Sequence, residues 1–537
     1  MLIPLLGFSS TGEPLLDETI TGVEAASAPA LECVRRLGLA SPLVVCLPPE
    51  LLTRAPSSAL AELLRDTECV VGPFALERAD EACQWLSAGA KYALFLPPAG
   101  ETMVPLAEAI KAAAAEVAIP AERIVMLFDA PSVHDPAARE RFAADVESLA
   151  APQGAGCYEY CKKDTCGVVS GLAVVVPPGT PEAAEIMLLG LLGPLAARDR
   201  LQIFVGGLSS CAQPHGVGAL HQTYSLHTLA VATLAEDARS KPQLASIPSG
   251  ALPPVVELPT AAASLYALFA ARPLELGPCV AACGRTDRSD GLYPTLVQEH
   301  EGVALGIVYS SAASIGAALR CGRGVYWSRS RQSLWRKGDT SGAWQTLRKI
   351  RLDCDSDALC FTVTQHGDPP AFCHKTTLSC WGAPTGLHAL QLTLRSHLQT
   401  APSKSYTKLL FDDAKLLHNK LLEEAQELAE ATEPDHVAAK AADLLYLAMV
   451  RCVSAGVGLP EIASHLDRRA LKLDRRPGNS KKERIASGDE ILSKMADRAK
   501  SKAAVEEGTA QPRAQAAWMP VLAIGAYVAY CAIAARQ

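Results

Sequence analysis

The stretch Leu43-Val44-Val45-Cys46-Leu47, followed by Pro48, is short, apolar and rich in β-branched residues. A run of this kind, bounded by proline, is typical of a buried strand in a parallel sheet. Similar runs follow at Cys69–Phe74, Tyr92–Pro97, Arg123–Phe128, Leu172–Val176 and Gln202–Val205. Ala- and Leu-rich helical patterns lie between them, as at Pro105–Val117 and Pro181–Leu195. The alternation predicts an α/β domain over residues 1–275 with a mostly parallel sheet, and a complete or degenerate (β/α) barrel suits its length.

The composition is that of an ordinary globular protein of several domains. Of 537 residues, 49% are apolar and 20% are charged, which excludes a mainly disordered chain, a collagen and a multi-span membrane protein. The net charge of −7 gives no general attraction to nucleic acid. Seventeen cysteines are too dilute for a disulfide scaffold. Met1–Ser10 lacks a basic region ahead of its apolar residues, so a reducing, cytoplasmic location is expected.

Little chemistry is visible in the first half of the chain. Val205-Gly206-Gly207-Leu208 fits either a phosphate loop or a simple turn, and the turn is favoured because short glycine motifs have low specificity. Cys157, Cys161 and Cys166 lie close together without a matching second pair, which favours a chance cluster over a zinc site. This domain therefore fits a scaffold or a regulatory binding module.

Residues that could bind metals or phosphate, or act in catalysis, are concentrated between residues 285 and 385. Asp353, Asp355 and Asp357 alternate, so on a strand they would share one face and repel each other unless a cation such as Mg²⁺ lay between them. Cys354 would then point to the opposite face. The alternative is a surface acidic loop.

Downstream thiols suggest a second metal. Cys373 and Cys380, together with Cys354, offer three ligands for Zn²⁺ and leave a fourth position for a water whose pKa is lowered. His374 is placed to act as a general acid or base. Each cysteine by itself would more often be a core thiol.

Hydroxyl groups, cations and glycines are concentrated upstream, in Tyr326–Arg331 and Leu334–Gly342. Such a segment can surround a phosphate with side-chain and backbone donors. Trp335 could stack on a base or line the core.

These blocks, taken in order, resemble the phosphoribosyl-AMP cyclohydrolase family. The resemblance runs from Asp290-Gly291-Leu292 through the segments above to Cys373-His374 and Cys380. It implies an α+β domain, a homodimer with a shared active site, Mg²⁺ on the three aspartates, and Zn²⁺ on Cys373 and Cys380 with Cys354 from the partner chain. It also implies hydrolytic opening of the adenine ring by zinc-activated water, with Lys337 and His374 as catalytic residues. The expected substrate-binding residues are Ser328, Arg329, Ser330, Arg331, Trp335, Thr340 and Ser341.

A helical pattern fills residues 402–473. Apolar residues recur at the helical period from Lys408 to Ala431, which places Glu423, Glu424 and Glu427 close together. A second helix, about His436 to Cys452, carries Asp443 in an apolar segment, where a shared metal would satisfy it. The alternative is an acidic solvent face with Asp443 at an interface.

This region resembles the phosphoribosyl-ATP pyrophosphatase family, which is all-α. The matching residues are Ser405-Tyr406-Thr407, Lys420, Glu423-Glu424 with Glu427, and Ala441–Tyr446. The resemblance implies Mg²⁺ on Glu423, Glu424, Glu427 and Asp443. The sequence departs from the family at Lys440, where a cation replaces a carboxylate ligand.

The order of the domains is similar to that of the fungal multifunctional histidine-biosynthesis family. The expected boundaries are 285–385 for the cyclohydrolase, 400–475 for the pyrophosphatase and 476–513 for a charged linker. The histidinol dehydrogenase domain of that family does not fit in the remaining residues, so we expect it to be missing. Two readings stay open: a bifunctional enzyme for consecutive steps on small nucleotide substrates, or a cyclohydrolase whose helical domain serves dimerisation. The uncharged segment 514–535 is either a C-terminal membrane anchor or a helix packed on protein.

Overall fold

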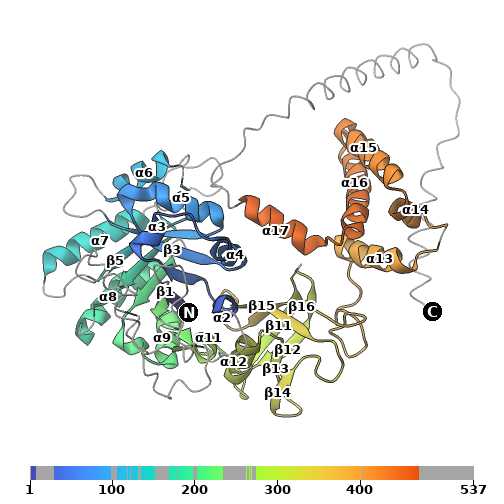
Figure 1. Cartoon of the computed structure of the whole chain (residues 1–537). Helices are drawn as coiled ribbons and strands as arrows, with labels where there is room; N and C mark the ends of the chain where they lie inside the picture. The colour runs from blue at the N-terminus through green and yellow to red at the C-terminus, as the bar shows by residue number, and fades with distance from the viewer. Residues whose placement is uncertain are drawn as a thin grey trace. The chain divides into compact units, whose positions relative to one another are not determined.

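The computed structural model describes residues 2–7 and 30–470, with longer internal gaps at 151–168 and 234–261. The described chain contains a parallel barrel, then a region of mixed strands and helices, then a helical region (Figure 1). The general prediction of a multidomain chain, α/β at its start and all-helical later, is confirmed.

Eight parallel strands close the N-terminal barrel in sequential order, each paired with its neighbours and β1 with β8. The strands are β1 Leu2–Gly7, β2 Leu43–Cys46, β3 Cys69–Ala75, β4 Tyr92–Leu96, β5 Ile124–Asp129, β6 Gly171–Val175, β7 Gln202–Gly206 and β8 His227–Ala230. The six predicted strands are confirmed as β2 to β7, whereas β1 and β8 were not predicted. The barrel is therefore complete in strand order.

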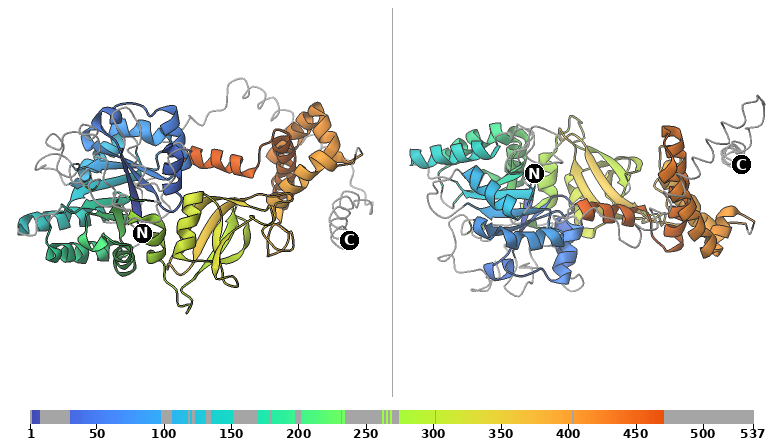
Figure 2. Two further views of the ribbon diagram at one scale, coloured as in Figure 1. Left: turned by 60° about the horizontal axis from the view of Figure 1, so that its bottom comes forward. Right: turned by 90° about the horizontal axis from the view of Figure 1, so that it is seen from above.

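Helices alternate with these strands and lie around them, as two further views show (Figure 2). They are α2 Ala30–Leu37, α3 Pro49–Leu52, α4 Ser58–Asp66, α5 Ala79–Ala88, α6 Leu106–Glu116, α7 Pro136–Ala150, α8 Glu182–Ala196 and α9 Pro214–Tyr224. The helices predicted at Pro105–Val117 and Pro181–Leu195 correspond to α6 and α8. Short 3₁₀ turns occur at Leu76–Arg78 and Ser209–Cys211.

The barrel interior is a packed apolar core. Side chains from alternate strand positions, including Val44, Val125, Phe204 and Leu229, form one buried cluster. Leu265 and Leu268 join that cluster, and Leu268 packs so closely on Gly206 that a Cβ there would lie 2.6 Å from Leu268 Cδ1. The chain itself therefore fills the described interior of the barrel.

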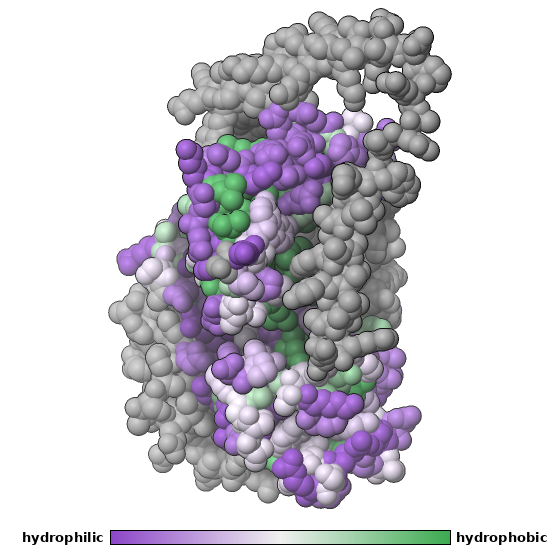
Figure 3. All heavy atoms as spheres, turned by 90° about the vertical axis from the view of Figure 1, so that its right-hand side faces the viewer, coloured by the Kyte–Doolittle hydropathy of each residue, from purple (hydrophilic) through white to green (hydrophobic). Residues whose placement is uncertain are grey.

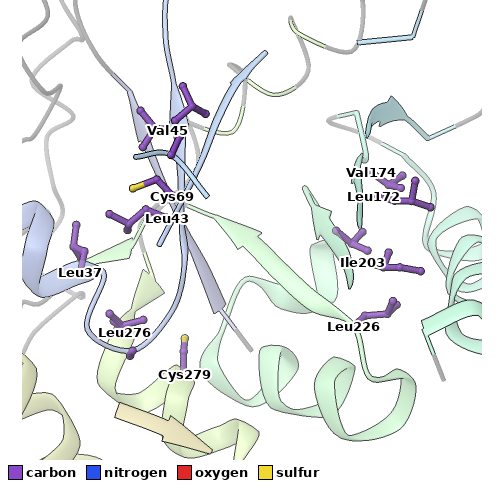
Figure 4. Packing of buried hydrophobic residues seen from close by; sticks show 14 of the residues in the cluster. Leu37, Leu43, Val45, Cys69, Leu172, Val174, Ile203, Leu226, Leu276 and Cys279 are labelled. Carbon is purple, nitrogen blue, oxygen red and sulfur yellow. The ribbon is translucent and has the colours of Figure 1, made fainter. Parts of the chain in front are cut away.

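A second core lies between the strands and the surrounding helices. Figure 4 shows part of it, where Leu43, Val45 and Cys69 of the strands gather near Leu37 of α2. Leu276 and Cys279 belong to the same cluster and come from α11 (Leu276–Cys283), which follows the short paired strands β9 (Ala232–Thr233) and β10 (Leu274–Glu275). The alternation of inward and outward side chains along each strand produces these two separate cores.

The next region is α+β, as predicted. A four-stranded sheet has the order β12-β11-β16-β15, and β13 and β14 form a separate hairpin. The elements are β11 Tyr293–Glu299, β12 Ala304–Ser310, α12 Ala312–Cys321, β13 Val325–Ser328, β14 Ser333–Arg336, β15 Gln345–Leu352 and β16 Leu359–Gln365. Apolar residues of this region belong to the same buried cluster as the outer layer of the barrel.

Direct contacts join the barrel to this α+β region. Gly277 of α11 faces Gly316 of α12 so closely that an added Cβ would lie 2.5 Å from the Gly316 Cα. The backbone N–H of Ile350 donates to Leu39 O at 2.6 Å, and Lys349 Nζ lies 2.9 Å from Glu68 Oε1. Packing, hydrogen bonding and charge all contribute to the junction.

The helical region consists of α13 Gly386–Thr400, α14 Tyr406–Asp412, α15 Ala414–Glu430, α16 Pro434–Ser454 and α17 Leu459–Ala470. The uninterrupted helix implied by the periodicity from Lys408 to Ala431 is wrong, because the chain breaks at Asp413. The Asp413 carboxylate accepts hydrogen bonds from the backbone N–H groups of Lys415 and Leu416, so it caps α15. The second predicted helix is confirmed as α16.

Several sequence predictions fall outside the described residues: the cysteines at 157, 161 and 166, the charged segment 476–513 and the apolar segment 514–535. Within the described part, no single helix has the length and apolar character to cross a bilayer, although α16 and α17, bent by 106°, pass that test as a pair. On the face in Figure 3, the coloured residues are mainly hydrophilic, with small interrupted apolar areas.

Candidate functional site

The three aspartates of the predicted magnesium site lie in a turn between β15 and β16. The expectation that they alternate along a strand is wrong, because Asp353–Asp357 separates the two strands and Ser356 adopts a left-handed conformation, with φ of 66°. The Asp353 carboxylate accepts a hydrogen bond from the backbone N–H of Ala358 at 3.1 Å, which closes the turn. The alternating faces inferred for Cys354 and the aspartates therefore do not apply.

The turn nevertheless brings the three carboxylates together. Ligand oxygens of Asp353, Asp355 and Asp357 all lie within 4.8 Å of one another, and all three residues are exposed. The negative charge of Asp355, followed by Asp353, raises the pKa of Asp357. The mutual repulsion and the hard oxygen donors fit a divalent cation such as Mg²⁺.

Ser356 holds this turn in place on its buried side. Its side chain is buried, in contrast to the aspartates on either side. The backbone N–H of Arg285 donates to Ser356 O at 2.7 Å, and His221 Nε2 of α9 lies 3.3 Å from Ser356 Oγ. Burial lowers the pKa of His221 to about 4, so its imidazole is neutral at pH 7 and adds no cation beneath the aspartates.

The predicted zinc ligands Cys373 and Cys380 lie close enough to interact through their thiols. A hydrogen bond from the backbone of Lys375 is the main cause of a lowered pKa at Cys373, while burial raises the pKa of Cys380. A pair with one thiol biased toward thiolate suits a soft, divalent metal such as Zn²⁺.

Lys337 lies beside these cysteines in the folded region. It is buried, and its ammonium donates to Ala343 O at 3.2 Å and Ala371 O at 3.3 Å. Burial lowers the pKa of Lys337, and the charges of Cys380 and Cys373 oppose that shift. The Lys337 ammonium therefore lies where its charge stabilises the thiolates, and its two hydrogen bonds link the loops of Ala343 and Ala371.

His374 and Cys354 occupy different surroundings. His374 is exposed, and its Nδ1 lies 3.8 Å from Cys373 Sγ. Cys354 is also exposed, in the aspartate turn. Among the described residues, Cys354, Cys373 and Cys380 form no group whose ligand atoms lie within 4.8 Å of one another. One chain thus brings two of the three predicted zinc ligands together.

The predicted phosphate-binding residues surround the hairpin of β13 and β14. Ser328 is buried and accepts from the backbone N–H of Arg331 at 3.4 Å, which holds the tip of the hairpin. Arg329, Ser330 and Arg331 at that tip are exposed. The fold therefore displays two guanidinium groups and a hydroxyl on one turn.

The other predicted substrate-binding residues lie further along the hairpin and its following turn. Trp335 is half-buried and packs on Tyr326, with ring centroids 5.9 Å apart, which favours a place at the edge of the core over base stacking. Thr340 and Ser341 are exposed in the turn after β14. Asp339 in that turn pairs with Arg323 at 3.2 Å.

An aromatic and arginine cluster near the hairpin was not predicted. Arg329 lies over the Tyr309 ring at 4.0 Å from its centroid, and Arg288 lies over the same ring at 4.6 Å. Arg288 also pairs with Asp290 at 2.6 Å. Asp290 belongs to a block of the cyclohydrolase resemblance, and that block was the sequence feature that pointed to this part of the cluster. Tyr309 comes from another strand, and no sequence feature pointed to it.

In the helical region, Lys440 lies among the predicted metal ligands. Its ammonium is 3.3 Å from Glu424 and 3.7 Å from Asp443, and it forms an ion pair with Glu427. The hydrogen bond from Lys440 lowers the pKa of Glu427. Glu423 pairs instead with Lys420 at 2.8 Å. Within the described chain, these four carboxylates form no cluster with ligand oxygens within 4.8 Å of one another.

The glycine segment Val205–Leu208 at the end of β7 is better explained as a simple turn than as a phosphate loop. The next donors along the chain, the N–H and the hydroxyl of Ser209, bind the carboxylate of buried Glu185 at 3.0 and 2.9 Å. Gly207 has φ of 83° and packs against Val176 O, where a Cβ would lie 2.2 Å away. An internal carboxylate thus uses the donors that a phosphate would need.

Comparisons with known proteins agree with this division. The family model "Phosphoribosyl-AMP cyclohydrolase" matches residues 307–382, and "Phosphoribosyl-ATP pyrophosphohydrolase" matches residues 387–470. The "Histidine biosynthesis bifunctional protein HisIE" of Parasynechococcus marenigrum is 35% identical over 194 residues, which are 32% of this chain and 86% of that protein.

The chain belongs to the family of these bifunctional histidine-biosynthesis proteins. The predicted hydrolase class, with a cyclohydrolase and a pyrophosphohydrolase domain, is thereby confirmed. The "Histidine biosynthesis bifunctional protein his7" of Schizosaccharomyces pombe is 48% identical over 39% of this chain and 49% of its own length. The "Histidine biosynthesis trifunctional protein" of Saccharomyces cerevisiae is 48% identical over 37% of this chain and 24% of its own length. The chain thus spans half or less of these fungal relatives.

Proposed function

We propose that this chain is a bifunctional hydrolase that converts phosphoribosyl-ATP to phosphoribosyl-AMP and pyrophosphate, and then opens the adenine ring of phosphoribosyl-AMP. The proposal rests on the two matching family models, in adjoining segments of one chain. The convergence of the three aspartates within 4.8 Å is the single structural observation that carries the cyclohydrolase part. The predicted segments 285–385 and 400–475 are our proposed extents of the two domains.

The α+β region supplies distinct groups for the ring-opening step. Mg²⁺ would be held by Asp353, Asp355 and Asp357, while Zn²⁺ on Cys373 and Cys380 would supply an activated water. His374, exposed next to Cys373, is our candidate for proton transfer. These assignments are consistent with the metal dependence of the two domain families.

The hairpin tip is proposed to bind the phosphates of the substrate. Arg329 and Arg331 provide fork-shaped donors that match phosphate oxygens, and Ser330 adds a hydroxyl. Thr340 and Ser341 offer further hydroxyls from the next turn. Lys337 is buried and bound to two carbonyls, so its contacts support a positioning role beside the thiols.

The third zinc ligand is proposed to come from a second copy of the chain. Cys373 and Cys380 interact within one chain, whereas Cys354 does not join them in the described residues. A homodimer in which Cys354 of the partner chain completes the site would reconcile these observations.

A second candidate function is a cyclohydrolase whose helical domain lacks strong pyrophosphatase activity. The contacts of Lys440 with three of the four acidic residues favour it, because the ammonium lies where the carboxylates would otherwise bind Mg²⁺. The helical domain would then serve mainly dimerisation.

A cytoplasmic location stays a prediction. The C-terminal membrane anchor also stays a prediction, because segment 514–535 is outside the described residues.

One experiment separates these possibilities. Purified full-length protein is given phosphoribosyl-ATP with Mg²⁺ and Zn²⁺, and the nucleotides are followed by chromatography. The bifunctional proposal predicts the ring-opened product. Unconsumed phosphoribosyl-ATP, together with ring opening of added phosphoribosyl-AMP, would support the cyclohydrolase alone. Accumulation of phosphoribosyl-AMP would overturn the cyclohydrolase proposal.

A further inference from the structure

We propose that the N-terminal barrel holds the aspartate turn of the cyclohydrolase in its metal-binding conformation, through a hydrogen bond between His221 and Ser356. This inference rests on the proposed function, because it takes Asp353–Asp357 as the magnesium site. It assigns to the barrel a positioning role in the reaction of the following domain.

Strain and charge repulsion in the turn oppose its own closing contacts, which run from Ala358 N–H to the Asp353 carboxylate and from Asp353 N–H to Ala358 O, each at 3.1 Å. Ser356 has φ of 66°, a left-handed conformation that costs a residue with a side chain roughly 1 kcal/mol. Within the turn, the backbone N–H of Ser356 contacts Asp353 O at the long distance of 3.4 Å. Three mutually repelling carboxylates further disfavour the closed form when no cation is bound.

Two further contacts support the turn on its buried side. His221 Nε2 lies 3.3 Å from Ser356 Oγ, and the backbone N–H of Arg285 donates to Ser356 O at 2.7 Å. Arg285 is itself bound to the barrel, because its guanidinium donates to Gln222 O at 3.0 Å. Both contacts therefore lead back to adjacent residues of α9, while the aspartates stay exposed on the other side.

The end of α9 is firmly placed by its neighbours. The Gln222 amide donates to Ala282 O at 3.0 Å and to Gly284 O at 3.1 Å. Gly218 packs so closely on Ala282 that an added Cβ would lie 2.2 Å from its carbonyl oxygen. The His221 ring also stacks on His227 of β8, with centroids 5.8 Å apart. A rigid element thus presents the imidazole to the turn.

The barrel interior favours this positioning role over chemistry of its own. The described inward-facing residues are mainly apolar and include Leu265 and Leu268, and His227 of β8 packs against them with its ring 5.8 Å from that of Phe204. At the loop after β7, a common phosphate-binding position in such barrels, Glu185 binds the donors of Ser209.

The test uses the full-length protein and measures Mg²⁺ binding by titration calorimetry together with ring opening of phosphoribosyl-AMP at varied Mg²⁺. We expect His221→Ala to weaken Mg²⁺ binding about three- to tenfold, the loss of one hydrogen bond, with kcat at saturating Mg²⁺ nearly unchanged. His221→Gln, whose amide reaches a similar position, should restore most of the affinity. His215→Ala, at an exposed position of the same helix, is the matched control and should bind Mg²⁺ like the wild type.

A double-mutant cycle makes the outcome decisive. Ser356→Ala removes only a hydroxyl, so it tests the contact even if His221→Ala perturbs folding, and the double variant should be no weaker in Mg²⁺ binding than either single variant. Additive losses, or equal losses in His221→Ala and His221→Gln, would overturn the proposal, as would wild-type affinity in His221→Ala. Asp355→Asn separates the two levels: if it leaves Mg²⁺ binding unchanged, the magnesium assignment itself fails and this inference with it. If it abolishes the Mg²⁺ binding that supports ring opening while His221→Ala does not weaken that binding, only the positioning role fails.

Discussion

The ammonium of Lys440 on α16 lies 3.3 Å from Glu424 on α15, in the position between the helices where the family resemblance implies a metal ion. Lys440 also pairs with Glu427 and approaches Asp443 at 3.7 Å. An internal cation therefore neutralises carboxylates that would otherwise need Mg²⁺. The same contacts that stabilise the helix pair should weaken metal binding.

We accordingly expect Lys440→Glu to raise Mg²⁺-dependent pyrophosphate release from phosphoribosyl-ATP. The change removes a competing cation and adds the missing carboxylate, and one additional charged ligand contact is worth about tenfold or more in affinity. Pyrophosphate release is measured at several Mg²⁺ concentrations, and the Mg²⁺ dependence should shift to lower concentration.

Lys415→Glu is the matched control for this change. Lys415 is exposed on the same helix pair, so the substitution alters net charge equally without touching the acidic cluster. An unchanged or lower rate in Lys440→Glu would show that Lys440 does not displace a metal ion.

The aspartate turn predicts a link between Mg²⁺ and stability. Because Asp353 and Asp355 raise the pKa of Asp357, the three charges repel in the metal-free protein. Adding Mg²⁺ at 100 times its dissociation constant should raise the free energy of unfolding by about 2.7 kcal/mol. Asp355→Asn should remove that gain and unfold at a slightly higher temperature than metal-free wild type.

Thermal unfolding with and without Mg²⁺ checks this prediction. Asp467→Asn, at an exposed position of α17, provides the control and should keep the full effect of Mg²⁺. If Asp355→Asn gains as much stability from Mg²⁺ as the wild type does, then the turn is not the magnesium site.

Much of this fold follows from local pattern, and the exceptions have identifiable causes. Strands β2 to β7 are apolar runs, but β1 contains Pro4, which ordinarily argues against a strand, and β8 is the short run His227–Ala230 with polar residues. The break at Asp413 was missed because apolar periodicity continues across it, while the capping carboxylate decides where α15 begins.

The site was predictable in residue type but not in geometry. The spacing of the aspartates predicted that their carboxylates would meet, and they do, yet alternation on a strand was the wrong reason, because left-handed Ser356 folds the segment into a turn. Contacts between distant segments, such as His221 with Ser356 or Arg329 with Tyr309, depend on tertiary packing and leave no local signal.

Glu185 gives a prediction about the barrel itself. Its buried carboxylate accepts from both the N–H and the hydroxyl of Ser209, so Glu185→Ala should lower the free energy of unfolding by about 1.5–3 kcal/mol. Glu182→Ala, one turn earlier and exposed, should change it by less than about 0.5 kcal/mol. Chemical denaturation measures both, and equal effects would mean that the Ser209 contacts contribute little.

A shared zinc site predicts complementation between two inactive variants. Cys354→Ser and Cys373→Ser should each abolish ring opening alone, since each removes one of the proposed thiolate ligands. After the two proteins are unfolded together and refolded, half of the dimers would be mixed. Each mixed dimer would have one site with all three thiols intact, so activity should return to about a quarter of the wild-type value.

The control for that experiment is a refolded mixture of Cys373→Ser and Cys380→Ser. Both residues belong to the same chain's half of the site, so a mixed dimer would have no intact site and activity should stay absent. Recovery in the first mixture but not in the second requires Cys354 to act across the interface. The two substitutions are on different chains, so only a site built from both chains can contain all three intact thiols. Absence of recovery in both, with dimers present by light scattering, would place all three thiols in one chain and remove the need for a partner.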